Sequence, residues 1–123
     1  MNIKIEFIEK IVERTIPVVK LTKSKNGKTG TATFVFVEPT ILKSFENETP
    51  VIGHLSLICD NKSIITNDIS IFFKEGKPFL IKAIFIFKNS KEWFNFLSFM
   101  HYYSKETGLS FSETSTSFNK KAF

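Results

Sequence analysis

The sequence has few of the residues on which catalysis and metal binding depend. Its 123 residues include one cysteine and two histidines. A structural zinc site needs four closely spaced Cys or His ligands, whereas His54 and His101 lie in different predicted elements. The single thiol, Cys59, cannot form an internal disulfide, so we expect it to be a small core residue in a reducing compartment. We therefore predict no catalytic residue, no metal site and no cofactor.

Long apolar runs and a targeting segment are also missing. No apolar run approaches the roughly twenty residues that a bilayer-spanning helix needs. The first residues, MNIKIEFIEKIVER, include Glu6, Glu9 and Glu13. Those acids fit neither a secretory signal nor an acid-poor transit peptide. We expect a soluble or peripheral protein that works in the compartment where it is made.

Acidic residues are outnumbered by basic ones. The 17 lysines and arginines against 12 acids give a formal net charge of +5. Such a charge suits an anionic partner such as nucleic acid, a membrane surface or an acidic protein face, although it also serves solubility. With 42% hydrophobic residues and 15 phenylalanines, the chain is far from the composition of disordered proteins. The length suits one domain, predicted over 1–112, with a polar C-terminal tail over 113–123.

The periodic pattern is mostly that of strands. Val19 and Leu21 alternate with Lys20 and Thr22, as in a strand with one buried face. Asn26-Gly27 predicts the turn of a hairpin after this segment. The predicted strands are Pro17–Lys23, Thr31–Glu38, Val51–Cys59, Ile69–Lys74 and Phe79–Lys88, with Lys62–Thr66 as a short extra strand and Pro39–Pro50 as a loop with a short helical turn.

One later segment has the period of a helix. Asn89 or Ser90 can cap its start, and Gly108 is placed to end it. Apolar residues recur at i, i+3, i+4 and i+7 positions, namely Trp93, Phe96, Leu97, Met100 and Tyr103. The predicted fold class is α+β, a mainly antiparallel sheet with one long amphipathic C-terminal helix packed on it.

The last strand of that sheet is apolar on both faces. Its odd positions, Phe79 to Phe87, predict the face under the helix. Its even positions include Leu80, Ile84 and Ile86, with Phe72 on the neighbouring strand. We expect the N-terminal segment to cover this second face, and the alternative is a protein-docking surface.

Gly27-Lys28-Thr29 has the ending of a phosphate-binding P-loop. That motif requires a glycine five residues earlier and a helix afterwards. Thr22 occupies the glycine position, and the strand-like TATFVFVE follows. We therefore assign the triplet to the hairpin turn.

The clearest remaining signal is a basic hairpin. Four lysines, Lys20, Lys23, Lys25 and Lys28, occur within nine residues without an acid among them. An RNA-binding module would combine such lysines with aromatic residues on an open sheet face. No RNA-binding signature is present, so the residues alone indicate a small basic binding module that is not an enzyme.

Several motifs together resemble one protein family. They are PVVKLTKSKNGKTGTATFVFVEPTIL, then GKP, EWFNFLSFMHYYS and GLSF, in that order between Ile3 and Phe111. They are similar to the family's Val-Pro-x-Val-Arg-Leu-Thr-Arg-Ser-Arg segment with its Gly-Thr-Ala-x-Phe-x-Phe, its Asn-Gly-x-Pro turn, its Glu-Trp-x-Arg-Phe-Met-x-Phe-Met helix and its Gly-Leu-x-Phe. The family is the photosystem II assembly factor numbered twenty-eight in that series, the thirteen-kilodalton protein also called protein W.

The resemblance implies a function without catalysis or cofactor. Members are extrinsic proteins of the thylakoid membrane that attach to photosystem II assembly and repair intermediates, contacting core antenna and reaction-centre subunits. The implied location is the stromal side in a plastid, or the cytoplasmic side in a cyanobacterium, with no nucleic acid bound. Members are implied to join partner loops by strand addition through the sheet and the segment after Gly-Leu-x-Phe, so Leu109 and Phe111 join the four lysines as candidate contacts.

The resemblance is incomplete at the basic hairpin. Lys20, Lys23 and Lys25 stand where the family has arginines. Lysine keeps the charge but cannot make the planar two-pronged contact of arginine. A small RNA-binding module is the alternative function, and whether two copies form a weak homodimer stays open.

Overall fold

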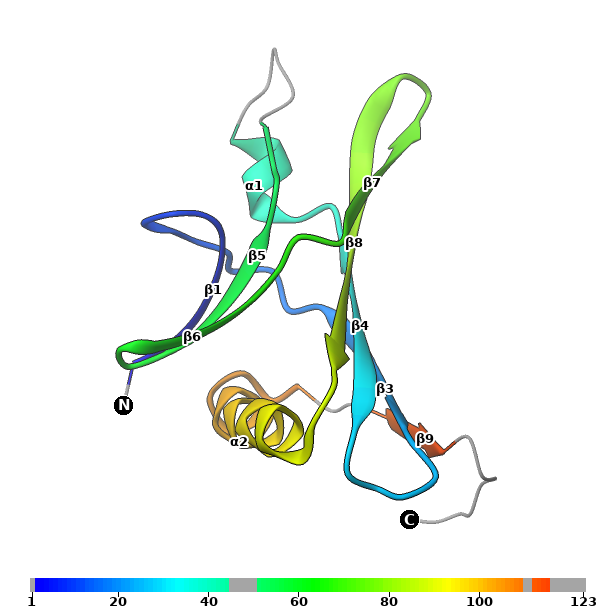
Figure 1. Cartoon of the computed structure of the whole chain (residues 1–123). Coiled ribbons are helices and arrows are strands. Elements are labelled where there is room, and N and C mark those ends of the chain that lie inside the picture. The colour runs from blue at the N-terminus through cyan, green and yellow to red at the C-terminus, as the bar shows by residue number, and fades with distance from the viewer. Residues whose placement is uncertain (1, 45–50, 110–111, 116–123) are drawn as a thin grey trace.

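The structure is a computed structural model that describes residues 2–44, 51–109 and 112–115. Within these residues the strands form two sheets, with two helices beside them (Figure 1). Sheet A has the order β2-β1-β5-β6 and sheet B the order β7-β8-β4-β3-β9. Sheet A consists of β1 (Ile3–Ile8), β2 (Ile11–Val12), β5 (Leu55–Cys59) and β6 (Lys62–Thr66), and sheet B of β3 (Val18–Lys23), β4 (Gly30–Val37), β7 (Ile69–Lys74), β8 (Lys77–Phe87) and β9 (Ser112–Ser115).

This architecture confirms the predicted α+β class. Every strand pair is antiparallel except β3 with β9, which is parallel. The predicted hairpin is the β3–β4 pair, and the short extra strand at Lys62–Thr66 is β6. The division of the strands into two sheets was not foreseen, because the N-terminal segment supplies two strands of sheet A that the sequence analysis did not assign.

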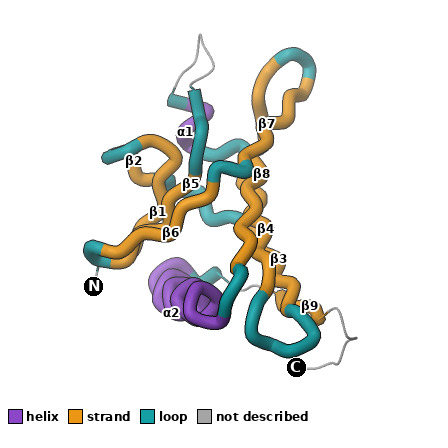
Figure 2. The backbone as a smooth tube through the Cα atoms, viewed as in Figure 1, coloured by secondary structure: helices purple, strands orange, loops and turns teal. Residues whose placement is uncertain are grey.

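Helix α2 (Ser90–Thr107) lies between the two sheets at one end of the molecule, and α1 (Thr40–Lys43) lies toward the other end (Figures 1 and 2). The Asn89 side chain caps α2 by accepting a hydrogen bond from the Glu92 N–H at 2.9 Å. Gly108 ends the helix with a left-handed backbone, φ 79°. Both predicted helix signals are therefore confirmed.

The core fills the space that the sheets and α2 enclose. Phe7 of sheet A contacts Phe36 of sheet B edge to face, with ring centroids 4.9 Å apart. Phe96 of α2 stacks on Phe87 at 4.7 Å. Four helix residues predicted to be apolar are buried, Trp93, Phe96, Met100 and Tyr103, and they are joined by Phe99. These aromatic contacts connect both sheets and the helix in a single hydrophobic cluster.

The prediction that the N-terminal segment covers the second face of the sheet is wrong. Ile5 and Phe7 of β1 are buried in the cluster between the sheets, on the same side of sheet B as α2. The N-terminal segment pairs with β5 and completes a second sheet, because its alternating apolar residues need a core and a strand partner. The opposite face of sheet B has no covering element among the residues described.

Within the described part of the chain, neither helix has the length and apolar content that crossing a bilayer requires.

Candidate docking surface

The face of sheet B that turns away from α2 carries a shallow apolar groove. We call it the outer groove. It has a volume of about 760 Å³, and its lining residues come from four neighbouring strands. They are Val18 and Lys20 of β3, Thr33 and Val35 of β4, Phe72 and Phe73 of β7, and Phe79, Leu80 and Lys82 of β8.

Strand register explains how these residues meet. Val18 pairs with Val35, which in turn pairs with Lys82, so the three side chains form one row across the sheet. The next row, through Val19 and Phe34, faces the core because successive residues of a strand point to opposite faces. The alternation seen in the sequence therefore separates a core face from the outer groove. Phe79 was predicted to face the helix, but it is only half-buried and lines the outer groove.

Large apolar side chains are exposed on this face. Val18 is 64% exposed, Phe73 56% and Ile86 62%. Scattered apolar residues are ordinary on protein surfaces, whereas a contiguous patch on a sheet face commonly marks a binding site. This face is thus uncovered among the described residues, and the docking surface that the sequence analysis gave as the alternative stays a prediction.

The charged residues that line the outer groove are both basic. Lys20 enters it from β3 and Lys82 from β8, and no acidic residue lines it. Their alkyl stems can pack along the apolar surface while the ammonium groups remain in water. The groove thus combines apolar contact area with two positive charges.

The four candidate lysines do not share one face. Lys20 belongs to the outer groove, whereas Lys23 lies three positions further along β3, where strand alternation directs it to the other face. Lys25 and Lys28 are exposed in the turn between β3 and β4. The sequence spacing suggested one basic cluster, and the structure distributes it over two faces and a turn.

That turn is organised by side chains and by one glycine. Asn26 Oδ1 accepts hydrogen bonds from Ser24 Oγ at 2.6 Å and from the Lys28 N–H at 2.9 Å. Gly27 has φ 72°, and its N–H donates to the Ser24 carbonyl oxygen at 3.0 Å. The triplet Gly27-Lys28-Thr29 is therefore a hairpin turn, as predicted, and β4 begins at the next residue.

Of the two candidate contact residues near the C-terminus, Leu109 and Phe111, the structure describes only the first. Leu109 is half-buried and packs against the core cluster, and its N–H donates to Thr107 Oγ1 at 3.2 Å. Phe111 lies outside the residues that the structure describes. The segment after it forms β9, which pairs with β3 from Lys20 to Lys23. The first residues of the predicted polar tail thus lie beside the basic strand.

The cysteine and the two histidines, which were considered as reactive or metal-binding residues, occupy separate positions in the fold. Cys59 is half-buried and packs against the core, at the end of β5. His54 lies before β5, one residue ahead of the strand in which it was expected, and His101 is exposed on α2. In the described ranges, no three His, Cys, Asp or Glu side chains gather as metal ligands would.

Sequence reasoning missed the buried carboxylate of Glu13. Its side chain accepts hydrogen bonds from the Thr15, Thr40 and Ile41 N–H groups at 2.8 to 2.9 Å and from the Thr40 hydroxyl at 2.7 Å. Burial of the phenol, and to a smaller extent the negative charge of Glu13, raises the pKa of nearby Tyr103 to about 12. Glu13 therefore fastens the N-terminal segment to α1. Only its position between the apolar β2 and Pro17 could have suggested this role.

The fold and the outer groove define a small basic α+β domain with an open, apolar sheet face bordered by lysines. The family model described as Psb28 protein matches residues 5–111. This chain belongs to the Psb28 family.

Several relatives carry the name photosystem II reaction center Psb28 protein. The relative from Phaeodactylum tricornutum is 40% identical over 115 residues, which are 94% of this chain and 100% of the relative. The one from a Synechocystis species is 40% identical over 90% of this chain and 97% of its own length. The one from Guillardia theta is 38% identical over 92% of this chain and 97% of its own length.

Proposed function

We propose that this chain is a non-enzymatic accessory protein of photosystem II that binds assembly or repair intermediates. The names of the relatives support the association with photosystem II. The observation that carries a binding role is the outer groove, an apolar sheet face without cover among the described residues. The partners we propose are the core antenna and reaction-centre subunits.

The proposed location is the thylakoid surface, as a peripheral protein on the stromal side in a plastid or the cytoplasmic side in a cyanobacterium. Positive charge supports this placement, since the chain carries a net charge of +5 and anionic lipids attract basic surfaces. Washing isolated thylakoids with high salt should release the protein without detergent, and retention after the wash would contradict peripheral attachment.

The proposed contact consists of the outer groove with Lys20 and Lys82, extended by Lys25 and Lys28 at the neighbouring turn. Lys23, at the end of β3 and directed to the other face, would contribute only its positive charge. Apolar area in the groove would supply affinity, and the lysines would orient a partner segment that carries acidic residues. Leu109 and Phe111 remain candidate contacts because the segment that follows them runs beside β3.

The proposal predicts what the tagged full-length chain recovers from solubilised thylakoids. We expect chlorophyll-containing complexes that include the core antenna subunit and lack the full complement of photosystem II subunits. The double charge reversal Lys20→Glu with Lys82→Glu should lower recovery at least about tenfold. The introduced glutamates would repel the acidic residues of the partner, and placing like charges together costs more than about 1.4 kcal/mol of binding free energy.

The matched control reverses two lysines elsewhere. Lys91 and Lys105 are exposed on α2, outside the outer groove. Lys91→Glu with Lys105→Glu changes the net charge by the same amount and should leave recovery close to that of the unaltered chain. Equal losses in both variants would mean that only net charge matters. Recovery of RNA without the core antenna subunit would favour the RNA-binding alternative.

A further inference from the structure

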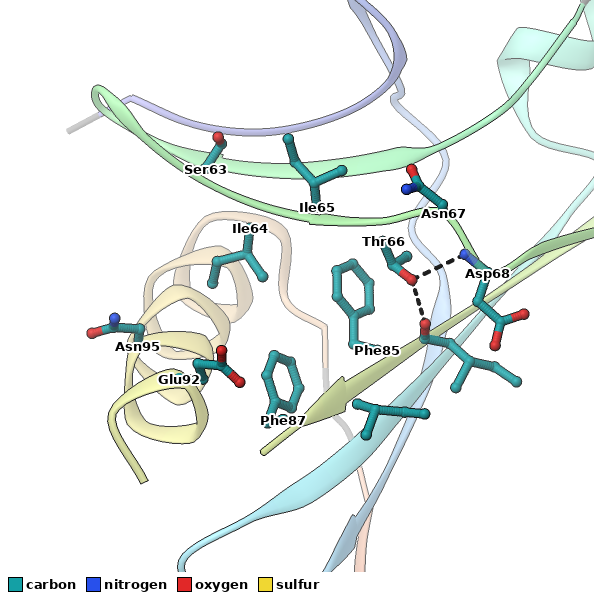
Figure 3. Close-up of a pocket in the computed structure, with 12 residues that line it drawn as sticks. Ser63, Ile64, Ile65, Thr66, Asn67, Asp68, Phe85, Phe87, Glu92 and Asn95 are labelled. Atoms are coloured by element: carbon teal, nitrogen blue, oxygen red, sulfur yellow. Dashed lines mark hydrogen bonds between the residues drawn. The ribbon is translucent and has the colours of Figure 1, made fainter. Parts of the chain in front are cut away.

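A second cleft, of about 500 Å³, opens between β6, the end of β8 and the first turn of α2 (Figure 3). None of its lining residues lines the outer groove. Thr66 Oγ1 marks one end of the cleft, since it donates to the Ile84 carbonyl oxygen at 2.5 Å and accepts from the Asp68 N–H at 3.1 Å. From this tie between the sheets, β6 runs away from β8 toward its hairpin tip (Figure 1).

The lining of the cleft is a mixture of polar and apolar groups over a firmly held apolar floor. Ile64 points from β6 toward the rings of Phe85 and Phe87 (Figure 3). The two phenylalanines are 2% and 5% exposed and stack on each other at 5.9 Å. Phe87 also stacks on Phe96 of α2. These nearly covered rings therefore form a preformed floor, and the apolar lining residues that a ligand could contact are Ile65 and Ile86, which are largely exposed, and the half-buried Ile64.

The charge of the cleft is opposite to that of the chain. Asp68 and Glu92 line it, without any lysine, arginine or histidine, although the net charge of the chain is +5. The two carboxylates lie at opposite ends (Figure 3). Glu92 is held in place because its Oε1 accepts from the Lys88 N–H at 2.9 Å while its own N–H binds Asn89. A cationic group is favoured at each end.

The strand beside the cleft is an edge strand. Among the described strands, β6 pairs only with β5. Two residues separate the paired Cys59 and Lys62, which makes this a two-residue hairpin. In such hairpins the closing pair is of the hydrogen-bonded kind. Hydrogen-bonded and non-hydrogen-bonded pairs alternate, so Ser63 and Ile65 direct their backbone N–H and C=O groups away from β5. These groups can pair with an added extended segment.

We propose that this cleft binds an extended segment of a partner protein that has apolar side chains in its middle and a lysine or arginine at each end. The apolar residues would lie on Ile64, Ile65 and Ile86 above the floor of the cleft, and the two basic residues would reach Asp68 and Glu92. This site is separate from the outer groove, and the proposal does not depend on the identity of the photosystem II partner.

The test is a titration of the isotope-labelled full-length chain with a synthetic peptide, followed by backbone amide resonances. The probe is the end-blocked heptapeptide Lys-Val-Thr-Val-Thr-Val-Lys, and its matched control has glutamate in place of both lysines. The lysine peptide should shift amides of β6, of the end of β8 and of the first turn of α2. The glutamate peptide should shift none of them. Raising the salt concentration should weaken binding of the lysine peptide.

Two variants that each remove one negative charge test whether Asp68 and Glu92 bind the lysines of the peptide. Asp68→Asn and Glu92→Gln should each weaken binding about two- to fivefold, the range of a solvent-exposed ion pair. Gln at position 92 can still accept the hydrogen bond from the Lys88 N–H. Lys82→Gln in the outer groove should leave the affinity unchanged.

Three results of the titration would overturn the proposal. They are equal binding of the glutamate peptide, shifts located at the outer groove, and no shift at millimolar peptide. If the cleft resonances of the peptide-free chain shift as the protein is concentrated, a second copy occupies the cleft and the proposal is also wrong.

Discussion

The first residue of β4, Gly30, lies directly against the indole of Trp93. A Cβ at position 30 would stand 2.8 Å from Cη2 of Trp93 and 2.7 Å from the Thr22 carbonyl oxygen. Both distances are shorter than side chains tolerate, and the Thr22 oxygen belongs to the paired strand and cannot swing aside. The close contact between β4 and α2 therefore requires glycine at this position.

We predict that Gly30→Ala lowers the free energy of unfolding by about 1 to 3 kcal/mol, the usual cost of overpacking. Chemical denaturation followed by Trp93 fluorescence measures the change. The matched control is Gly53→Ala, since a Cβ at Gly53 would meet nothing within 4 Å. The control should change stability by no more than about 0.5 kcal/mol. Equal stability of the two variants would contradict the contact.

The buried carboxylate of Glu13 gives a second prediction. Glu13→Ala should destabilise the fold by about 2 to 4 kcal/mol, because the N–H groups of Thr40 and Ile41 would lose their charged acceptor. Thermal unfolding followed by circular dichroism measures the loss. The exposed Glu9 provides the control, and Glu9→Ala should have little effect. A loss no larger than that of the control would refute the role of Glu13.

The phenol of Tyr103 gives a pH prediction. Burial, followed by the charge of Glu13, raises its pKa from 10.0 to about 12. The folded protein therefore holds this proton more tightly than the unfolded chain. Tyr103 contributes its full stabilisation below pH 10, and that contribution is lost as the pH rises from 10 to 12.

Ultraviolet titration of tyrosinate in Tyr102→Phe, which leaves Tyr103 as the single tyrosine, should show a midpoint near pH 12. Adding Glu13→Gln should lower this midpoint, because it removes the neighbouring negative charge. A midpoint near pH 10 in the folded Tyr102→Phe protein would show that burial and the charge of Glu13 do not raise the pKa of Tyr103.

The turn between β3 and β4 gives the last prediction. Gly27 has φ 72°, a left-handed conformation that costs other residues about 1 to 2 kcal/mol. Gly27→Ala should lower stability by about that amount. Lys28→Ala in the same turn is the control, since its exposed side chain can be removed while its N–H still binds Asn26. Urea unfolding of the two variants compares them, and equal midpoints would contradict the strained turn.

Local signals in the sequence predicted most elements of the fold. The alternation of Val19 and Leu21, the Asn89 cap and the Gly108 stop depend on neighbouring residues, so one sequence was enough to identify them. The partition into two sheets depends on contacts such as Phe7 with Phe36, which join distant segments. The local sequence of β1 does not show whether this segment pairs with β5 in a second sheet or packs over the outer face of sheet B.

The candidate site was predicted only in part. Apolar even positions on β8, such as Leu80 and Ile84, predicted a face that needs a partner. Leu80 lines the outer groove, and Ile84 lies further along the same strand. The lysines were grouped because they are close in sequence. Their distribution over two faces follows from the two-residue period of β3, which already places Lys20 and Lys23 on opposite faces, so the strand pattern could have separated them and closeness in sequence was misleading. Asp68 and Glu92 share a cleft only through tertiary packing.

The pairing of β1 with β5 has a consequence for folding during synthesis. Ile5 of β1 pairs with Leu57 of β5. One edge of β1 therefore has no strand partner until nearly half the chain has been translated. Sheet B can begin with the local β3–β4 hairpin, whereas sheet A depends on closing a long loop. Such non-local pairing slows folding. At ribosomal rates of about 5 to 20 residues per second, β1 must wait several seconds with its apolar residues exposed, and chaperones have that interval in which to bind it.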